Sequence, residues 1–308
     1  MEKTFILGLG TQKAGTTWFR DYLPGLNHVD MGFSKEYHVF DALTLPGHGG
    51  WYWRALRDHM LGRVGLNGGS SGRNRAAYWP FLRNTERYFD YFEALLDQDG
   101  VFLTGDITPS YSGLDAATLR RINDGFQKRG IRVRPVFFMR DPVERCWSAV
   151  RMGRRNAVKK GRKGVRPFKL KLSEEQHLMH VAGSRQYRLR TEYHRTIGQA
   201  EDVFGAGEVI EEFFERLFTP AAIKTICARL GLDYREPDFA RATNVSGKSA
   251  DIPVETKRRV ALLYKDVYSF LEARYSPQVL EELWPSYRLI KGEGKICTGV
   301  GGDSREGY

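Results

Sequence analysis

The stretch from Ile6 to Leu23, ILGLGTQKAGTTWFRDYL, constrains the fold of this chain more than any other segment. A short apolar run enters a glycine-rich turn, and a helical pattern follows over about 16–23. Glycines let backbone N–H groups converge in such a turn, the start of a helix favours an anion, and the hydroxyls of Thr16 and Thr17 are further donors. The stretch therefore predicts a strand, a loop and a helix that together bind an anion.

Two common nucleotide-binding motifs do not fit this loop. Gly10 and Gly15 have the spacing of a Walker A motif, GxxxxGK[ST], but Thr16 stands where that motif needs its lysine. The dinucleotide fingerprint GxGxxG fails as well, because Gly8 and Gly10 are followed by Lys13. The loop thus predicts phosphate binding with the lysine inside the turn.

Three further apolar runs predict strands: GVFLTGD (100–106), VRPVFFMRDP (133–142) and GEVIEEFF (207–214). A helical pattern over about 115–127 separates the first two of them. Strands that alternate with helices indicate an α/β fold with a central, mostly parallel sheet flanked by helices. In such folds the working residues lie at the carboxyl ends of the strands.

Charge and cysteine content narrow the class of protein. Lysine and arginine exceed aspartate and glutamate by 48 to 37, a net charge of +11, which favours an anionic partner. The three cysteines are widely spaced, which indicates neither a disulfide framework nor a zinc site. No apolar run is long enough for a secretory signal or a membrane span, so a cytoplasmic protein is expected.

The chain is predicted to form one domain over 1–285, followed by a glycine-rich tail over 286–308. Two long loops are expected inside the domain. One, over 60–80, is rich in Gly, Ser, Asn and Arg and is predicted to be mobile. The other, over 151–171, has ten basic and no acidic residues; it is expected either to be a solvated loop or to border the cleft of an acidic ligand.

The segment QKAGTTW, which begins at Gln12, resembles the 5′-phosphosulfate loop of sulfotransferases that use 3′-phosphoadenosine 5′-phosphosulfate (PAPS). The resemblance implies the P-loop-kinase-like sulfotransferase fold, PAPS as sulfuryl donor, 3′-phosphoadenosine 5′-phosphate (PAP) as product, and no metal. It implies that Lys13 reaches the oxygen between sulfur and phosphorus and that Trp18 lies against adenine. The 5′-phosphate would be held by the loop residues Ala14, Gly15, Thr16 and Thr17.

A second anion site is predicted at RDPVERCWS, which begins at Arg140. Arg140 ends an apolar strand, Pro142 suits the first turn of a helix, and Ser148 lies about two turns further on, where it can face the same ligand. Taken alone, RDP is equally compatible with a helix start that holds a buried ion pair. The segment resembles the family's 3′-phosphate motif, which implies contacts from Arg140 and Ser148, with Arg145 pairing inside the fold. Lys248 lies in a segment that resembles the loop covering the cofactor.

On the acceptor side, SKEYHVFD (34–41) resembles the KExHFFD segment of glycan sulfotransferases. That resemblance implies Glu36 as the general base, with His38 as the rival. GDITPSYSGL (105–114) resembles the family's GEKTPxY segment, although Ile107 replaces its lysine, so no second catalytic lysine is carried over. The acceptor-binding residues implied there are Asp106, Ser110 and Tyr111. The acceptor would be a hydroxyl or amine of a glycan or small molecule, which is expected to be acidic.

Two other functions remain open from the sequence. In an NTP-dependent kinase or ATPase, VFLTGD would be a Walker B strand and its aspartate a magnesium ligand, but GK[ST] is missing. In a polyanion-binding module, residues 151–171 would be the binding segment. No basic segment interleaved with aromatic residues, typical of nucleic-acid recognition, is present.

Overall fold

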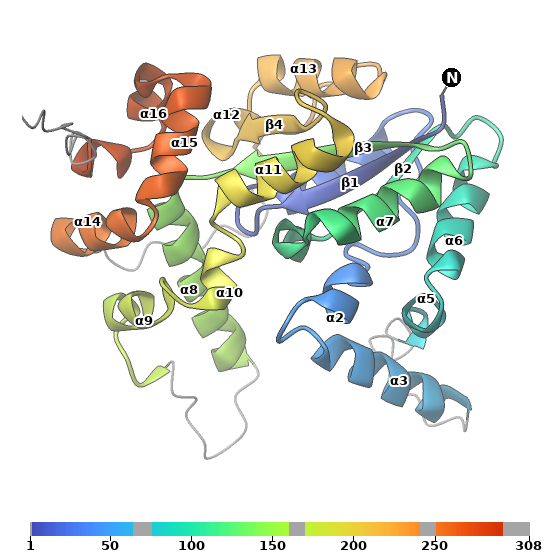
Figure 1. Cartoon of the computed structure of the whole chain (residues 1–308), viewed down its shortest axis with the longest axis horizontal. Helices are drawn as coiled ribbons and strands as arrows, with labels where there is room; N and C mark the ends of the chain where they lie inside the picture. The colour runs from blue at the N-terminus through green and yellow to red at the C-terminus, as the bar shows by residue number, and fades with distance from the viewer. Residues whose placement is uncertain (1, 64–75, 160–169, 241–250, 292–308) are drawn as a thin grey trace, which may run out of the picture.

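The computed structural model describes residues 2–63, 76–159, 170–240 and 251–291. Within these ranges, four strands form one parallel sheet in the order β2-β1-β3-β4 (Figure 1). The strands are β1 (Thr4–Gly10), β2 (Leu103–Ile107), β3 (Arg132–Met139) and β4 (Ile210–Phe213). Each falls within or overlaps one of the predicted apolar runs, so the predicted α/β fold with a parallel sheet is confirmed.

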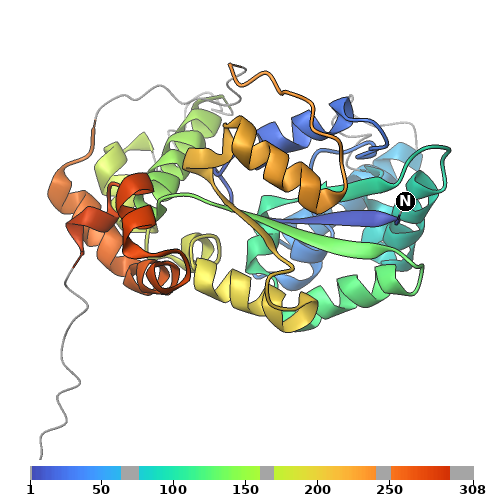
Figure 2. The same ribbon diagram turned by 90° about the horizontal axis from the view of Figure 1, so that it is seen from above.

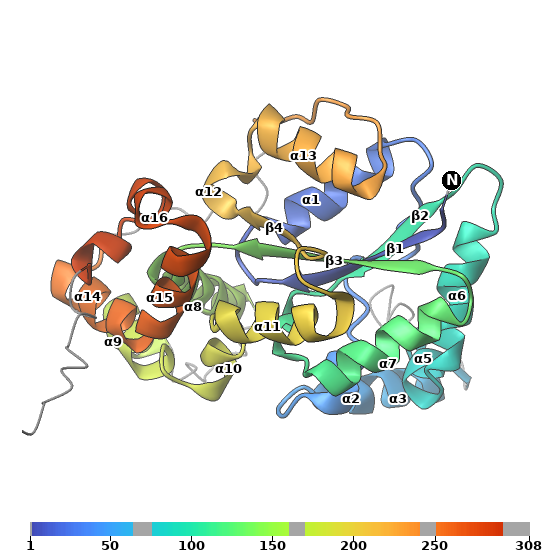
Figure 3. The ribbon, with the colours of Figure 1, turned by 45° about the horizontal axis from the view of Figure 1, so that its top comes forward.

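Both faces of the sheet are covered, which explains why its strands are continuous apolar runs. All seven residues of β1 are buried; Phe5 and Leu7 pack into one layer and Ile6 into the other. Figure 3 shows the helices that cover the two faces. One face carries α1 (Thr16–Tyr22), α12 (Phe214–Leu217) and α13 (Pro220–Leu230), and the other carries α6 (Glu86–Leu96), α7 (Ala116–Gln127) and α11 (Tyr193–Phe204).

The remaining helices gather beyond the sheet in two groups (Figures 1 and 2). One group contains α8 (Pro142–Lys159), α9 (Glu174–Val181), α10 (Arg185–Arg188), α14 (Val254–Leu263), α15 (Lys265–Tyr275), α16 (Pro277–Leu283) and the 3₁₀ turn η4 (Tyr287–Leu289). The other contains α2 (Phe40–Thr44), α3 (Gly50–Arg63) and α5 (Trp79–Arg83). The 3₁₀ turns η1 (Leu23–Gly25) and η2 (Pro109–Gly113) follow α1 and β2. None of the helices in the described ranges is long and apolar enough to cross a membrane.

Parts of both predicted loops belong to helices. Residues 151–159 continue α8, because its buried side chains, among them Trp147 and Val150, pack this helix into the core up to Ala157. Only residues 160–169 of the basic segment lie outside the described ranges. Likewise, residues 60–63 belong to α3 and 79–80 to α5, so 64–75 is the part of the glycine-rich segment that is not described.

The predicted start of the tail at 286 is wrong. Ser286, Tyr287 and Ile290 are buried, and the last two pack against the main hydrophobic core. The backbone N–H of Ser286 donates to the Asp141 carboxylate at 3.0 Å, and the Ser286 hydroxyl donates to it as well. Because the buried Asp141 needs donors, it holds the segment after α16 against the start of α8. Residues 292–308 lie outside the described ranges.

Candidate active site

The loop between β1 and α1 has the backbone geometry of a tight anion-binding turn. Gly15, the residue before α1, has a φ of 84°, and a Cβ there would lie 2.6 Å from Leu217 Cδ2, so only glycine fits. Lys13 also has a left-handed φ, 77°, which is unfavourable for a residue with a side chain and typical of functional sites. No described side chain caps the helix that begins at Thr16, which leaves the N–H groups of its first turn for a ligand.

The second predicted anion motif touches this loop directly. The Arg140 guanidinium donates from Nη1 to the carbonyl oxygen of Lys13 at 3.1 Å, although 127 positions separate the two residues. The ring of Phe214 lies 4.4 Å below the guanidinium, and the hydroxyl of Tyr193 donates to the Arg140 carbonyl at 2.7 Å. These contacts bring the two motifs together at the carboxyl ends of β1 and β3. Ser148 lies on α8 and is buried.

Cations converge on Lys13. Burial, followed by repulsion from Arg155, Arg140 and Arg151, lowers the pKa of Lys13 to about 8. Arg151 lies over the ring of Trp147 at 4.3 Å, and Arg140 has only a distant ion pair, 3.7 Å, with Glu144. Repulsion of this kind is relieved when an anion binds among the cations. The lowered pKa of Lys13 thus reflects a buried amine among like charges.

Asp141 and Arg145, which follow Arg140 in the second motif, make contacts inside the fold. Asp141 is fully buried and accepts from the backbone N–H of Val143 at 3.0 Å, besides its bonds to Ser286. Arg145 is fully buried, lies 5.2 Å over the ring of Tyr187 and donates to the Cys146 sulfur at 3.2 Å. Arg145 thus makes these contacts inside the protein.

The two rival base candidates are bonded to each other. His38 Nε2 lies 3.0 Å from Glu36 Oε2, and His38 Nδ1 lies 2.7 Å from Asp41 Oδ2. Asp41 is fully buried and also accepts from the hydroxyl of Ser110 and from the N–H of Ala42. The imidazole is therefore bridged between a buried carboxylate and the Glu36 carboxylate, whose side chain is 36% exposed. We call Glu36, His38 and Asp41 the acid–imidazole chain.

The protonation of this chain follows from its contacts. Burial alone would lower the pKa of His38, but the hydrogen bonds to Asp41 and Glu36 outweigh it and raise that pKa to about 9. Burial would raise the pKa of Asp41, but the bond and the charge of His38 together lower it. At neutral pH His38 is then an imidazolium that donates from both nitrogens, and it has no free lone pair. The partly exposed Glu36 carboxylate accepts one of these two hydrogen bonds.

Asp106 and Tyr111 do not face the surface, contrary to their predicted contact with the acceptor. Asp106 is fully buried and accepts from the hydroxyls of Thr108 at 2.6 Å, Tyr111 at 2.8 Å and Tyr88 at 3.0 Å. Burial raises the pKa of Asp106 to about 6 despite these bonds. Thr108 and Tyr111 in turn accept from the backbone N–H groups of residues 37–40. The geometry favours a supporting role: these residues hold the loop that carries Glu36 and His38.

We expect Asp106→Ala to lower the free energy of unfolding by about 2–4 kcal/mol, because it leaves three buried hydroxyls without their acceptor. Chemical denaturation followed by tryptophan fluorescence measures this loss. The matched control is Asp97→Ala, which removes an exposed carboxylate paired with Lys3 and should cost no more than about 0.5 kcal/mol. Equal losses in the two variants would show that the Asp106 network does not stabilise the fold.

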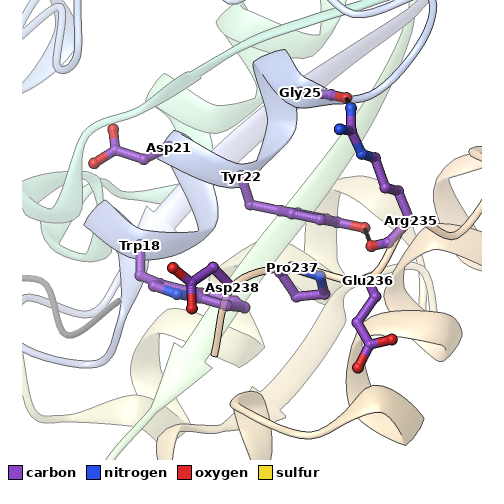
Figure 4. A pocket seen from close by; sticks show the side chains of 8 residues that line it. All are labelled: Trp18, Asp21, Tyr22, Gly25, Arg235, Glu236, Pro237 and Asp238. Atoms are coloured by element: carbon purple, nitrogen blue, oxygen red, sulfur yellow. Dashed lines mark hydrogen bonds between the residues drawn. The ribbon is translucent and has the colours of Figure 1, made fainter. Parts of the chain in front are cut away.

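Trp18 lies beside a pocket of about 280 Å³ between α1 and residues 235–238 (Figure 4). Its indole is 4% exposed and lies nearly parallel to the rings of Tyr22 and Phe239, with centroids 6.0 and 5.9 Å away. The hydroxyl of Tyr22 donates to the carbonyl of Arg235 at 2.7 Å, which ties the two walls of the pocket together. The predicted contact of Trp18 with adenine stays a prediction. Lys248 lies outside the described residues.

Sequence reasoning does not single out Asp41, Arg151 or Arg155. A signal for the arginines is present, since they follow Ser148 by three and seven residues and so share a face of α8 with it. Asp41 follows His38 by three residues, but only the structure shows their bond. In the described part of the chain, no group of three or more His, Cys, Asp or Glu side chains is arranged to hold a metal ion.

No protein-family model matches the sequence, and no curated protein matches it either. Among solved structures, the chain is similar to a sulfotransferase from Alicyclobacillus acidocaldarius, with a TM-score of 0.58 and 19% identity over 89% of this chain and 96% of the other. A weaker similarity, with a TM-score of 0.42 and 14% identity over 75% of each chain, is to the sulfotransferase domain from the curacin biosynthetic pathway. The first similarity shows that this chain has the fold of a sulfotransferase, as its loop motifs predicted.

Proposed function

We propose that this protein is a sulfotransferase that moves the sulfuryl group of PAPS to a hydroxyl or amine of an acceptor. The observation that carries the proposal is the bond from Arg140 to the Lys13 carbonyl, which joins the two predicted anion sites. PAPS carries negative charge at both its 5′ and its 3′ positions and therefore needs two such sites. The fold shared with a known sulfotransferase supports the same function.

On the donor side, Lys13 is proposed to bind the leaving oxygen between sulfur and phosphorus. The 5′-phosphate would be bound by the loop around Gly15 with Thr16 and Thr17, and the 3′-phosphate by Arg140 and Ser148. The lowered pKa of Lys13 supports this assignment, because burial and repulsion from the neighbouring arginines disfavour its charge, and a bound anion would relieve that repulsion. When bound, PAPS supplies the activated sulfuryl group and a good leaving group.

On the acceptor side, Glu36 is proposed as the general base, with His38 as the alternative. As the new bond forms between sulfur and the acceptor oxygen or nitrogen, the acceptor proton would pass to Glu36 and the bond from sulfur to the phosphate oxygen would break. Lys13 would offset the charge on that oxygen. By analogy with phosphoryl transfer, positioning and charge stabilisation supply most of the catalysis. His38, held by Asp41, keeps the Glu36 carboxylate in place.

The acceptor is proposed to be an acidic glycan or an acidic small molecule. The positive segment that begins at Arg151 and continues along α8 supports this, because a cationic surface beside the site attracts anions. Cytoplasmic location stays part of the same proposal.

A thermal-shift comparison of PAP, AMP and ATP without metal tests the donor. We expect PAP to raise the melting temperature most, because only PAP occupies both phosphate sites. Arg140→Gln should weaken PAP binding at least tenfold and leave the affinity for AMP nearly unchanged. Arg120→Gln, an exposed arginine on α7, is the control and should change neither.

Two results would contradict the proposed donor. If AMP stabilises the protein as well as PAP does, the argument from two sites fails. If ATP stabilises it most when the comparison is repeated with Mg²⁺, an NTP-dependent enzyme is the better description.

A further inference from the structure

The backbone around Arg190 is bonded to the loop between β1 and α1 and to the turn η2, which follows β2. It lies between α10 and α11, and its carbonyl accepts from the hydroxyl of Thr11, two residues before Lys13. Arg195, in the first turn of α11, donates to the carbonyls of Leu189 at 3.2 Å and Ser112 at 2.5 Å. These bonds anchor the segment on both sides, so the position of Arg190 is set by the fold.

The side chain of Arg190 is bonded to a neutral partner. Its Nη2 lies 3.3 Å from His48 Nε2. Because arginine can only donate, Nε2 must accept, which places the His48 proton on Nδ1. Burial and the charge of Arg190 lower the pKa of His48, in agreement with a neutral imidazole. The bond therefore leaves the positive charge of Arg190 uncompensated.

No carboxylate in the described part of the chain forms an ion pair with Arg190, although Asp41 and Glu36 are close enough to act on its charge. Burial and repulsion from Arg145 outweigh the attraction to these two carboxylates and lower the pKa of Arg190 to about 10. Arg190 is partly buried, and its contact with His48 uses only one of the N–H groups of the guanidinium. A half-buried cation without a paired carboxylate, next to the proposed base, indicates an anionic group on the bound molecule.

We propose that Arg190, supported by His48, binds a carboxylate of the acceptor, so that the substrates are hydroxylated or aminated carboxylic acids. The planar guanidinium offers two parallel N–H groups that match the two oxygens of a carboxylate. This inference rests on the proposed function, because it takes the acid–imidazole chain to face the acceptor. It makes Arg190 a residue that determines specificity, separate from the two phosphate sites.

Calorimetry with PAP-saturated protein tests this inference. The probes are 4-hydroxybenzoate, 4-hydroxyphenylacetate and glucuronate, each compared with its primary amide. We expect at least one carboxylate to bind about tenfold or more tightly than its amide, because a desolvated bond between two ions is stronger than one to a neutral group. In Arg190→Gln the ratio of carboxylate affinity to amide affinity should fall to about one. Arg190→Lys should keep part of the preference for the carboxylate.

Arg188→Gln is the matched control, since Arg188 lies on the same segment, is exposed and is paired with Glu192 at 3.3 Å. Arg188→Gln should have the same ratio of carboxylate affinity to amide affinity as the wild-type protein. The inference is overturned if no carboxylate is preferred, if the preference survives in Arg190→Gln, or if Arg190→Gln loses PAP affinity instead, which would place Arg190 on the donor. If the protein binds PAP but shows no preference for carboxylates, only the assignment of Arg190 to the acceptor is contradicted. If it binds no PAP, both that assignment and the proposed function are contradicted.

Discussion

Lys13→Ala is expected to reduce kcat about 10²–10³-fold while PAP binds with nearly unchanged affinity. The reason is that Lys13 would act on charge that develops on the leaving oxygen during transfer, whereas the phosphates would keep their proposed contacts to the loop backbone and to Arg140. Turnover with PAPS and calorimetry with PAP measure the two effects separately. Lys128→Ala, an exposed lysine at the end of α7, is the control and should change neither.

The same lysine predicts a pH dependence. Lysine is cationic below its pKa, and the pKa of Lys13 in the free protein is about 8 because of burial and three nearby arginines. The value of kcat/KM for PAPS should therefore fall above about pH 8, approaching tenfold per pH unit, as the cation is lost. A profile that stays flat to pH 10, or a Lys13→Ala variant that loses PAP affinity but keeps kcat, would contradict the role of Lys13 on the leaving oxygen.

Glu36→Gln is expected to reduce kcat about 10²–10⁴-fold with PAP affinity unchanged, because the amide cannot accept the acceptor proton. His38→Asn should reduce kcat less, since the imidazolium only holds the Glu36 carboxylate in place and does not itself accept the proton. Single-turnover assays with saturating PAPS compare the two variants. The control is Glu86→Gln on α6, whose side chain is 61% exposed and remote from the loop.

The opposite order of effects would change the assignment. If His38→Asn abolishes turnover and Glu36→Gln keeps most of it, His38 is the base and must lose its proton to Asp41 or to solvent first. Asp41→Asn tests the acid–imidazole chain itself, because it removes one of the two carboxylates that raise the pKa of His38. It should lower the pKa of His38, which NMR titration of the imidazole measures; an unchanged pKa would contradict the contact between the two side chains.

Much of the fold was predictable because its signals are local. β1 and β2 are buried along their whole length, and β3 is buried over its last five residues. The loop between β1 and α1 needs glycine at position 15, whose φ of 84° and tight space exclude a side chain. The extent of α8 was not predictable in this way. Its charged residues indicate a loop, but the helix continues because its opposite side packs into the core.

The candidate site shows the same division. The sequence places Glu36 and His38 two positions apart as rivals for one role, whereas the structure bonds them into one unit with Asp41. The sequence places Asp106 among acceptor contacts, but the sheet buries it beneath three hydroxyls. Burial and bonding partners depend on which segments the sheet brings side by side, and a local pattern does not contain them.

By itself, the sequence determined the parallel α/β fold and the glycine-rich turn between β1 and α1, since backbone conformation and apolar burial depend on residues that are neighbours in the chain. Only the tertiary structure decided that Arg140 reaches the Lys13 carbonyl across 127 positions and that Arg190 lies beside His48 with its charge uncompensated. The physical reason is that electrostatic and hydrogen-bonding partners are set by distance in space. The proposed donor therefore follows from local motifs, while the proposal that Arg190 binds an acceptor carboxylate depends on contacts that only the assembled site shows.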